Sequence, residues 1–192
     1  MKNKVARIWV DFDSLKVINE HEFRPFEILG EVLAIVKEEA SVLTSQVYVA
    51  MGYRGNGSHI PQSEIFEVYK LGGTLVPVPS FPAEGGRLKS LVDPTMITDA
   101  VLSLAKQELL DLIVIVTNDK DFIPLVRAAK ELGKAVWLFY GEQPAGSLLD
   151  QVRGYPDSRC TDIAEVLRNK MPEITSREAN RTDNTVVGLG GE

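Results

Sequence analysis

The run Leu112–Val116 constrains the fold of this chain more than any other feature, because all of its residues are apolar. A short, uninterrupted apolar run is typical of a strand that is buried on both faces of a sheet. Such strands belong mainly to parallel sheets, which carry helices on both faces. The run therefore predicts a sheet that is covered by helices on both sides.

Strand-like and helix-like segments alternate along the rest of the chain. The other predicted strands span 8–10, 46–50, 74–78 and 135–140. The predicted helices span 26–39, 63–71, 95–110 and 122–132, a further helix starts at 147, and the segment 163–169 ends the domain. Helices between successive strands imply parallel pairing through right-handed crossovers. We therefore expect an α/β fold, a three-layer sandwich with a mostly parallel sheet of about five strands.

The chain has 192 residues, which is the length of one domain, and we place that domain at residues 1–170. From Met171 onward the sequence is polar, so residues 171–192 are expected to form a flexible tail. The single Cys160 excludes an internal disulfide, and no apolar stretch suits a signal peptide or a membrane span. We expect a cytoplasmic protein with no membrane contact. The sequence leaves open a homo-oligomer and a protein partner bound through the tail.

The acidic charge balance bears on nucleic-acid binding. The formal net charge is −6, which argues against broad electrostatic binding of nucleic acid. A nuclease is not excluded, because clustered carboxylates lower the net charge and a bound metal ion reverses the local field.

Aspartates follow the first and fourth predicted strands, and others lie on the helix that leads into the fourth. The six are Asp11, Asp13, Asp93, Asp99, Asp119 and Asp121. Ligands of open parallel sheets bind beyond the carboxyl ends of the strands, so these side chains converge if the two strands are neighbours. Converging carboxylates repel one another, and Mg²⁺ or Mn²⁺ would relieve that repulsion through the oxygen ligands that both ions prefer. Such an ion can activate water and neutralise charge on a phosphoryl group, which is the chemistry of phosphodiester hydrolysis.

Several of these aspartates also have an ordinary structural explanation. Asp93 precedes a proline and suits a helix N-cap, and Asp119 could cap the helix that begins near Phe122. Asp13 could be a turn residue, and Asp99 a solvated helix residue.

Three blocks of the sequence resemble the NYN domain, a branch of the PIN-like nucleases. The blocks are 10–15 (VDFDSL), Lys89 with 92–93 and Asp99, and 115–122 (IVTNDKDF) with 124–125 and 133–134. The resemblance extends from about Arg7 to Phe139, and it is to the LabA-like members of the family. It implies a PIN-like, Rossmannoid fold and a metal-dependent ribonuclease that acts on RNA with Mg²⁺ or Mn²⁺.

The resemblance also implies roles for individual residues. The catalytic and metal-binding set would be Asp11, Asp93, Asp119 and Asp121. The supporting residues would be Asp13, Ser14, Asp99 and Thr117. The family usually has asparagine at the position of Ser14, and Lys89 lies one residue farther from Asp93 than is common.

Two loops at the same predicted edge carry residues that could contact RNA. One holds Tyr53 and Arg54, and the other holds Phe81, Arg87 and Lys89. An aromatic ring near a cation suits base stacking with phosphate contact, and it is also common in ordinary surface loops. We expect the three basic residues to bind the RNA backbone.

Two other functions remain open from the sequence. Asp11 and Asp13 resemble the nucleophile and acid of haloacid-dehalogenase-type phosphatases, with Asp119 and Asp121 as the metal motif. The glycine and threonine usual after the second aspartate are absent, and that type has no use for Asp93. The other alternative is a non-catalytic module of the same fold that binds RNA or protein.

Overall fold

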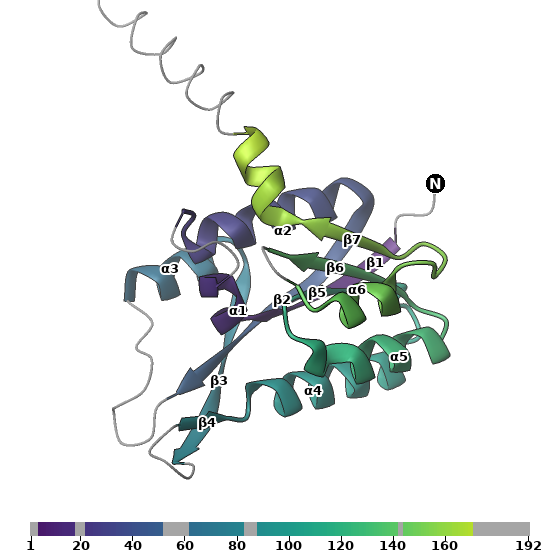
Figure 1. The fold of residues 1–192 in the computed structure, drawn as a ribbon, viewed down its shortest axis with the longest axis horizontal. Helices are drawn as coiled ribbons and strands as arrows, with labels where there is room; N and C mark the ends of the chain where they lie inside the picture. Colours follow the sequence, from purple (N-terminus) through teal and green to yellow (C-terminus); the bar gives the residue numbers. More distant parts are fainter. Residues whose placement is uncertain (1–3, 18–21, 52–61, 83–87, 142–143, 171–192) are drawn as a thin grey trace, which may run out of the picture.

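The computed structural model describes residues 4–17, 22–51, 62–82, 88–141 and 144–170, and its centre is one seven-stranded sheet (Figure 1). The strands are β1 (Lys4–Asp11), β2 (Ala40–Met51), β3 (Gly73–Pro82), β4 (Leu88–Ser90), β5 (Leu112–Val116), β6 (Ala135–Tyr140) and β7 (Arg159–Asp162). Their order in the sheet is β4-β3-β2-β1-β5-β6-β7. All neighbouring strands are parallel except β3 and β4, which form an antiparallel pair.

The α/β class and the mostly parallel sheet are confirmed, but the expected count of about five strands was too low. The two strands that sequence reasoning missed, β4 and β7, lie at the two edges of the sheet. Each is only three or four residues long and lacks an uninterrupted apolar run. Neither therefore carries the hydrophobic pattern on which the prediction depended.

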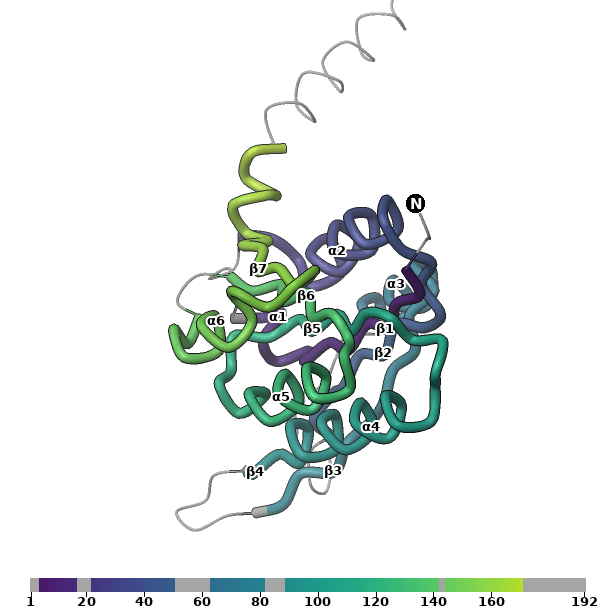
Figure 2. Tube along the Cα trace, turned by 90° about the vertical axis from the view of Figure 1, so that its right-hand side faces the viewer, coloured from purple at the N-terminus to yellow at the C-terminus, as the bar shows by residue number. Residues whose placement is uncertain are grey.

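Helices cover both faces of the sheet and complete a three-layer sandwich (Figures 1 and 2). They are α1 (Phe12–Val17), α2 (Pro25–Glu39), α3 (Gln62–Lys70), α4 (Val92–Lys106), the 3-10 helix η3 (Lys120–Phe122), α5 (Ile123–Glu131) and α6 (Gly146–Val152). Residues 163–170 are also helical. One hydrophobic cluster joins α1, α2 and the 163–170 helix to one face, and a second joins α4, α5 and α6 to the other.

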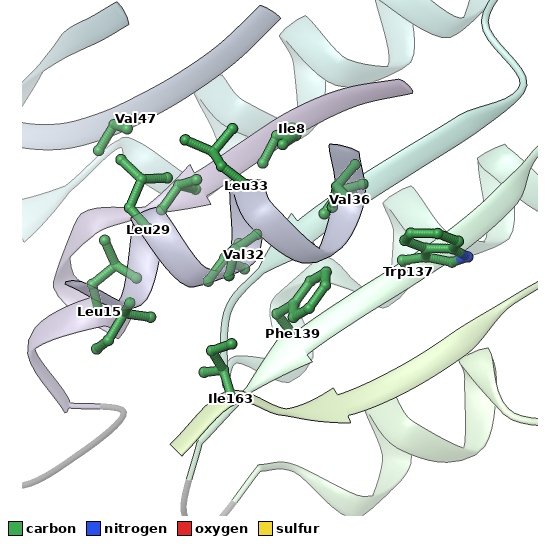
Figure 3. Close-up of a cluster of buried hydrophobic side chains, with 14 of the residues drawn as sticks. Ile8, Leu15, Leu29, Val32, Leu33, Val36, Val47, Trp137, Phe139 and Ile163 are labelled. Carbon is green, nitrogen blue, oxygen red and sulfur yellow. The ribbon is translucent and has the colours of Figure 1, made fainter. Parts of the chain in front are cut away.

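The two clusters explain the sequence of β5. Val114 packs into the cluster under α2, whereas Ile113 and Ile115 pack into the cluster under α4. Since both faces of β5 are buried, no position in the strand suits a polar residue. On the first face, Leu29 and Leu33 of α2 lie over the sheet at helical spacing (Figure 3). Burial of a leucine or valine side chain contributes about 1.5–3 kcal/mol, so these clusters dominate the stability of the domain.

The order of the strands reverses beside β1. From β1 the chain proceeds outward through β2 to β3, and after α4 it returns to pair β5 directly with the other side of β1. The carboxyl ends of β1 and β5 therefore meet at the point where open α/β sheets bind ligands. The pairing of these two strands is the condition under which the sequence predicted convergence of the aspartates.

Among the described residues, no helix is both long and apolar enough to cross a membrane. The tail predicted at 171–192 lies outside the described residues.

Candidate metal centre

Three carboxylates from two separate segments converge at this edge of the sheet. Asp93, Asp119 and Asp121 each offer an oxygen atom, and these atoms all lie within 4.8 Å of one another. Two oxygens bound to one Mg²⁺ lie at most about 4.2 Å apart, since each Mg–O distance is about 2.1 Å. Hence the trio, meaning these three aspartates, can hold one ion through its oxygens after a small adjustment of side chains or through a bridging water.

Asp119 and Asp121 owe their positions to a turn that follows β5. The Asp119 carboxylate accepts a hydrogen bond from the Asp121 backbone N–H at 2.9 Å and so caps η3. The Asp119 backbone N–H donates to the Thr117 hydroxyl at 3.1 Å. The capping role considered for Asp119 is confirmed, although the helix it caps is the short η3. Because one oxygen is used in this cap, the other is free to face an ion.

Asp93 lies in the first turn of α4, but it is not the N-cap that the sequence suggested. The N-cap is Leu91, and the Val92 N–H donates instead to the Ser90 hydroxyl at 3.0 Å. The Asp93 carboxylate is therefore not used for capping. Burial raises its pKa from 3.8 to about 6, with further contributions from the negative charges of Asp11, Asp119 and other nearby aspartates. A bound cation would reverse this effect.

Asp11 ends β1 in a buried network of hydroxyl groups. Its two oxygens accept hydrogen bonds from the Ser14 hydroxyl at 2.6 Å and from the Asp13 backbone N–H at 3.0 Å. The Ser14 and Thr117 hydroxyls lie 3.1 Å apart and connect this carboxylate to the turn after β5. Burial raises the pKa of Asp11, and the Ser14 hydrogen bond partly opposes that rise. Asp11 is not part of the trio, but it lines a cleft together with Asp119.

The remaining two aspartates make structural contacts. The exposed Asp13 carboxylate pairs with Lys16 at 3.3 Å. The Asp99 carboxylate accepts a hydrogen bond from the Tyr48 hydroxyl at 2.9 Å, and so it connects α4 to β2. Of the two interpretations of Asp99, the alternative of a freely solvated helix residue does not hold, because its carboxylate is partly buried and hydrogen-bonded. Burial, and then Asp99, raise the pKa of Tyr48.

Comparison with known families decides the classification. The family described as the NYN domain matches residues 5–158 of the chain. The chain belongs to the NYN domain family. A comparison with curated proteins found no match.

Solved structures are consistent with this fold. A protein of unknown function from Vibrio parahaemolyticus superposes with a TM-score of 0.64 at 19% identity, over 83% of this chain and 94% of that chain. This likeness shows the fold alone. An isochorismatase-like hydrolase from Alkaliphilus metalliredigens reaches a TM-score of only 0.37 at 9% identity, over 86% and 96% of the two chains. That score is too low to support any inference.

The basic residues predicted to contact RNA are only partly placed. Lys89 lies in β4 and lines a cleft together with Asp93 and Asp121 of this NYN domain. Arg54 and Arg87 lie outside the described residues. Sequence reasoning missed Lys120, which lines this cleft and also the cleft that contains Asp11. Its position between two aspartates of the 115–122 block was the available signal.

Proposed function

We propose that this NYN domain is a metal-dependent ribonuclease that hydrolyses RNA phosphodiester bonds with Mg²⁺ or Mn²⁺. The observation that carries this proposal is the convergence of Asp93, Asp119 and Asp121 at the reversal point of the sheet. Carboxylate oxygens are the ligands that these two ions prefer. Family membership supports the same activity.

Each residue of the site has a definable task under this proposal. The trio would hold the ion, directly or through a bridging water, and Asp11 would act from the adjoining cleft, directly or through a water molecule. The hydroxyls of Ser14 and Thr117 connect the Asp11 carboxylate to the turn after β5 and so fix their relative positions. The bound ion would lower the pKa of a coordinated water and neutralise charge on the phosphoryl group.

Contacts to the RNA backbone would come from the basic residues around the site. Lys89 faces the same cleft as Asp93 and Asp121, so a phosphate near the ion lies within its reach. Arg87 and Arg54 are proposed as further phosphate contacts from the sequence alone. The supporting roles proposed for Asp13 and Asp99 are structural, through Lys16 and Tyr48.

RNA cleavage by wild type and Asp119→Asn, each with Mn²⁺ and with EDTA, tests the proposal. Asparagine keeps the oxygen that caps η3 and removes only the charge, so the fold should be retained. We expect cleavage by wild type in Mn²⁺ alone, and none by Asp119→Asn. Asp150→Asn is the matched control, because Asp150 is an exposed residue of α6 outside the site, and it should cleave normally.

Other outcomes would point to other functions. Equal cleavage by wild type and Asp119→Asn would indicate a contaminating nuclease and contradict the proposal. Turnover of a phosphomonoester without RNA cleavage would favour the phosphatase alternative. Binding of Mn²⁺ with neither activity would favour a non-catalytic module.

A further inference from the structure

An arginine lies on the central strand β1 at a position that would suit an apolar residue. Arg7 is partly buried, and its register partners are Thr44 of β2 and the fully buried Ile113 of β5. Trp9, two residues farther along the same face, belongs to the hydrophobic cluster under α4. Arginine is rarely buried unless its charge is paired, because removing a guanidinium from water costs free energy. The stability of the core therefore does not explain this residue.

The charge of Arg7 has no acidic partner. Among the described residues, its guanidinium forms no ion pair, and its buried Nε atom has no hydrogen-bond partner. Its Nη1 atom donates a hydrogen bond to the Ser103 hydroxyl of α4 at 2.7 Å. By contrast, Arg24, Arg159 and Arg168 each pair with a carboxylate. What Arg7 gains from its position is a contact with α4.

This contact is one of two hydrogen bonds that connect α4 to the sheet. The helix begins beside the carboxyl end of β3 and runs back along the sheet, antiparallel to β1 (Figure 1). Asp99 accepts a hydrogen bond from Tyr48, and Ser103, one turn later, accepts one from Arg7. The apolar packing of the helix has no preferred direction, whereas hydrogen bonds do. Two such bonds one turn apart fix both the axial position and the tilt of α4.

The ion site is sensitive to the tilt of this helix. Asp93 precedes Asp99 by six residues, which is about 9 Å along the helix axis. If the Asp99 contact alone held α4, a tilt of about 10° around it would move Asp93 by about 1.6 Å. The oxygens of the trio lie within 4.8 Å of one another, whereas two direct ligands of one Mg²⁺ lie at most about 4.2 Å apart. A movement of that size away from Asp119 and Asp121 would therefore take Asp93 out of reach of a shared ion.

We propose that Arg7 is a positioning residue for the ion, because its hydrogen bond to Ser103 fixes α4 and so holds Asp93 within the trio. This inference rests on the part of the proposed function in which the trio holds the ion, and it does not require that the protein cleaves RNA. An apolar side chain at this position would suit the core better than a guanidinium does. Replacing Arg7 with an apolar residue should therefore weaken the ion site without weakening the fold.

The first experiment measures the Mn²⁺ dissociation constant without RNA, from the electron paramagnetic resonance signal of free Mn²⁺. Arg7→Met keeps a long side chain and removes the charge and the donor. It should raise the dissociation constant about tenfold, the low end of the loss that follows when a group that orients metal ligands is removed. Arg127→Met is the matched control, because it removes an arginine hydrogen bond between α5 and α6 and does not involve α4. It should bind Mn²⁺ like wild type.

The second experiment tests whether Arg7 acts through Ser103. Ser103→Ala should raise the Mn²⁺ dissociation constant as much as Arg7→Met does, and the double variant should raise it no further. Melting temperatures in EDTA separate positioning from stability. Arg7→Met should melt at or above the wild-type temperature, because it removes an unpaired, partly buried charge. Ser103→Ala should melt below it, because Arg7 then lacks its acceptor.

Three results would overturn this role of Arg7. They are an unchanged Mn²⁺ affinity in Arg7→Met, additive losses of affinity in the double variant, and a failure of wild type to bind Mn²⁺, which would also remove the ion site. Cleavage of RNA by a wild type whose Mn²⁺ affinity does not depend on Arg7 would refute the positioning role and leave the nuclease intact. Mn²⁺ affinity that depends on Arg7 and Ser103 without RNA cleavage would support the positioning role and refute the nuclease.

Discussion

At the scale of single residues, the site is defined by carboxylates whose charge the fold disfavours. Burial and neighbouring aspartates raise the pKa of Asp93 to about 6, although the start of a helix normally favours negative charge. A proton and a metal ion would therefore compete for the same oxygens. Without the ion, the stability of the fold should rise as the pH falls, whereas with the ion bound it should fall as the pH falls.

The first prediction concerns stability without metal. Since the folded-state pKa of Asp93 lies above its unfolded value of 3.8, this group favours the folded state below about pH 4, and that contribution is lost as the pH rises through about 6. In EDTA, the melting temperature of wild type should therefore rise relative to that of Asp93→Asn as the pH falls from 7 to about 4. A constant difference between the two proteins over this range would contradict the assignment.

The second prediction concerns the hydrogen bond between Ser14 and Asp11. Ser14→Ala removes the donor to a buried carboxylate, so the pKa of Asp11 should rise further and the protein should lose about 1–3 kcal/mol of stability. The acidic limb of the pH–activity profile should move to higher pH. Ser14→Asn supplies an amide N–H in place of the hydroxyl and should keep the wild-type limb. A profile that does not move in Ser14→Ala would exclude this role.

At the scale of elements, a partly buried hydrogen bond connects the helix that carries Asp93 to the sheet. The Tyr48 hydroxyl of β2 donates to Asp99 of α4. Tyr48→Phe leaves this partly buried carboxylate without its donor and should lower the free energy of unfolding by about 1–3 kcal/mol in urea denaturation. Asp99→Asn retains an acceptor oxygen and should lose less. An unfolding midpoint of Tyr48→Phe at the same urea concentration as that of wild type would contradict a stabilising role for this hydrogen bond.

The elements differ in how far their sequences determine them. β5 and β6 were predicted at their observed bounds, because each is an apolar run that the core requires. β4 and β7 were missed because short edge strands are defined by backbone pairing and not by apolar pattern. The start of α4 was misplaced because an Asp-Pro step suits two helix registers, and the Ser90 cap decides between them.

In the site, too, some contacts could be predicted from the sequence and others could not. The convergence of Asp11 with Asp119 could be predicted, because strand ends share an edge once β1 and β5 are neighbours. The contact between Asp99 and Tyr48 could not be predicted. These residues lie 51 positions apart, and nothing in the sequence around either one indicates the other as its partner. The position of Lys89 opposite Phe81 likewise requires the register of a strand that the sequence did not reveal.

At the scale of the whole molecule, ion binding should stabilise the fold. An ion at about 100 times its dissociation constant adds about 2.7 kcal/mol, or roughly 5–10 °C in melting temperature for a domain of this size. Mn²⁺ should produce this shift in wild type and in Asp150→Asn, and much less of it in Asp119→Asn. The trio would not be the ion site if Asp119→Asn responds to Mn²⁺ as wild type does.

The reversal of strand order beside β1 has a consequence for synthesis. The hydroxyls of Ser14 and Thr117 meet although 103 positions separate them, and the trio draws one member from α4 and two from the turn after β5. A ribosome that has translated only the first half of the chain has made one member of the trio, Asp93, and neither Asp119 nor Asp121. The three carboxylates of a growing polypeptide therefore come together only after the turn that follows β5 has left the exit tunnel.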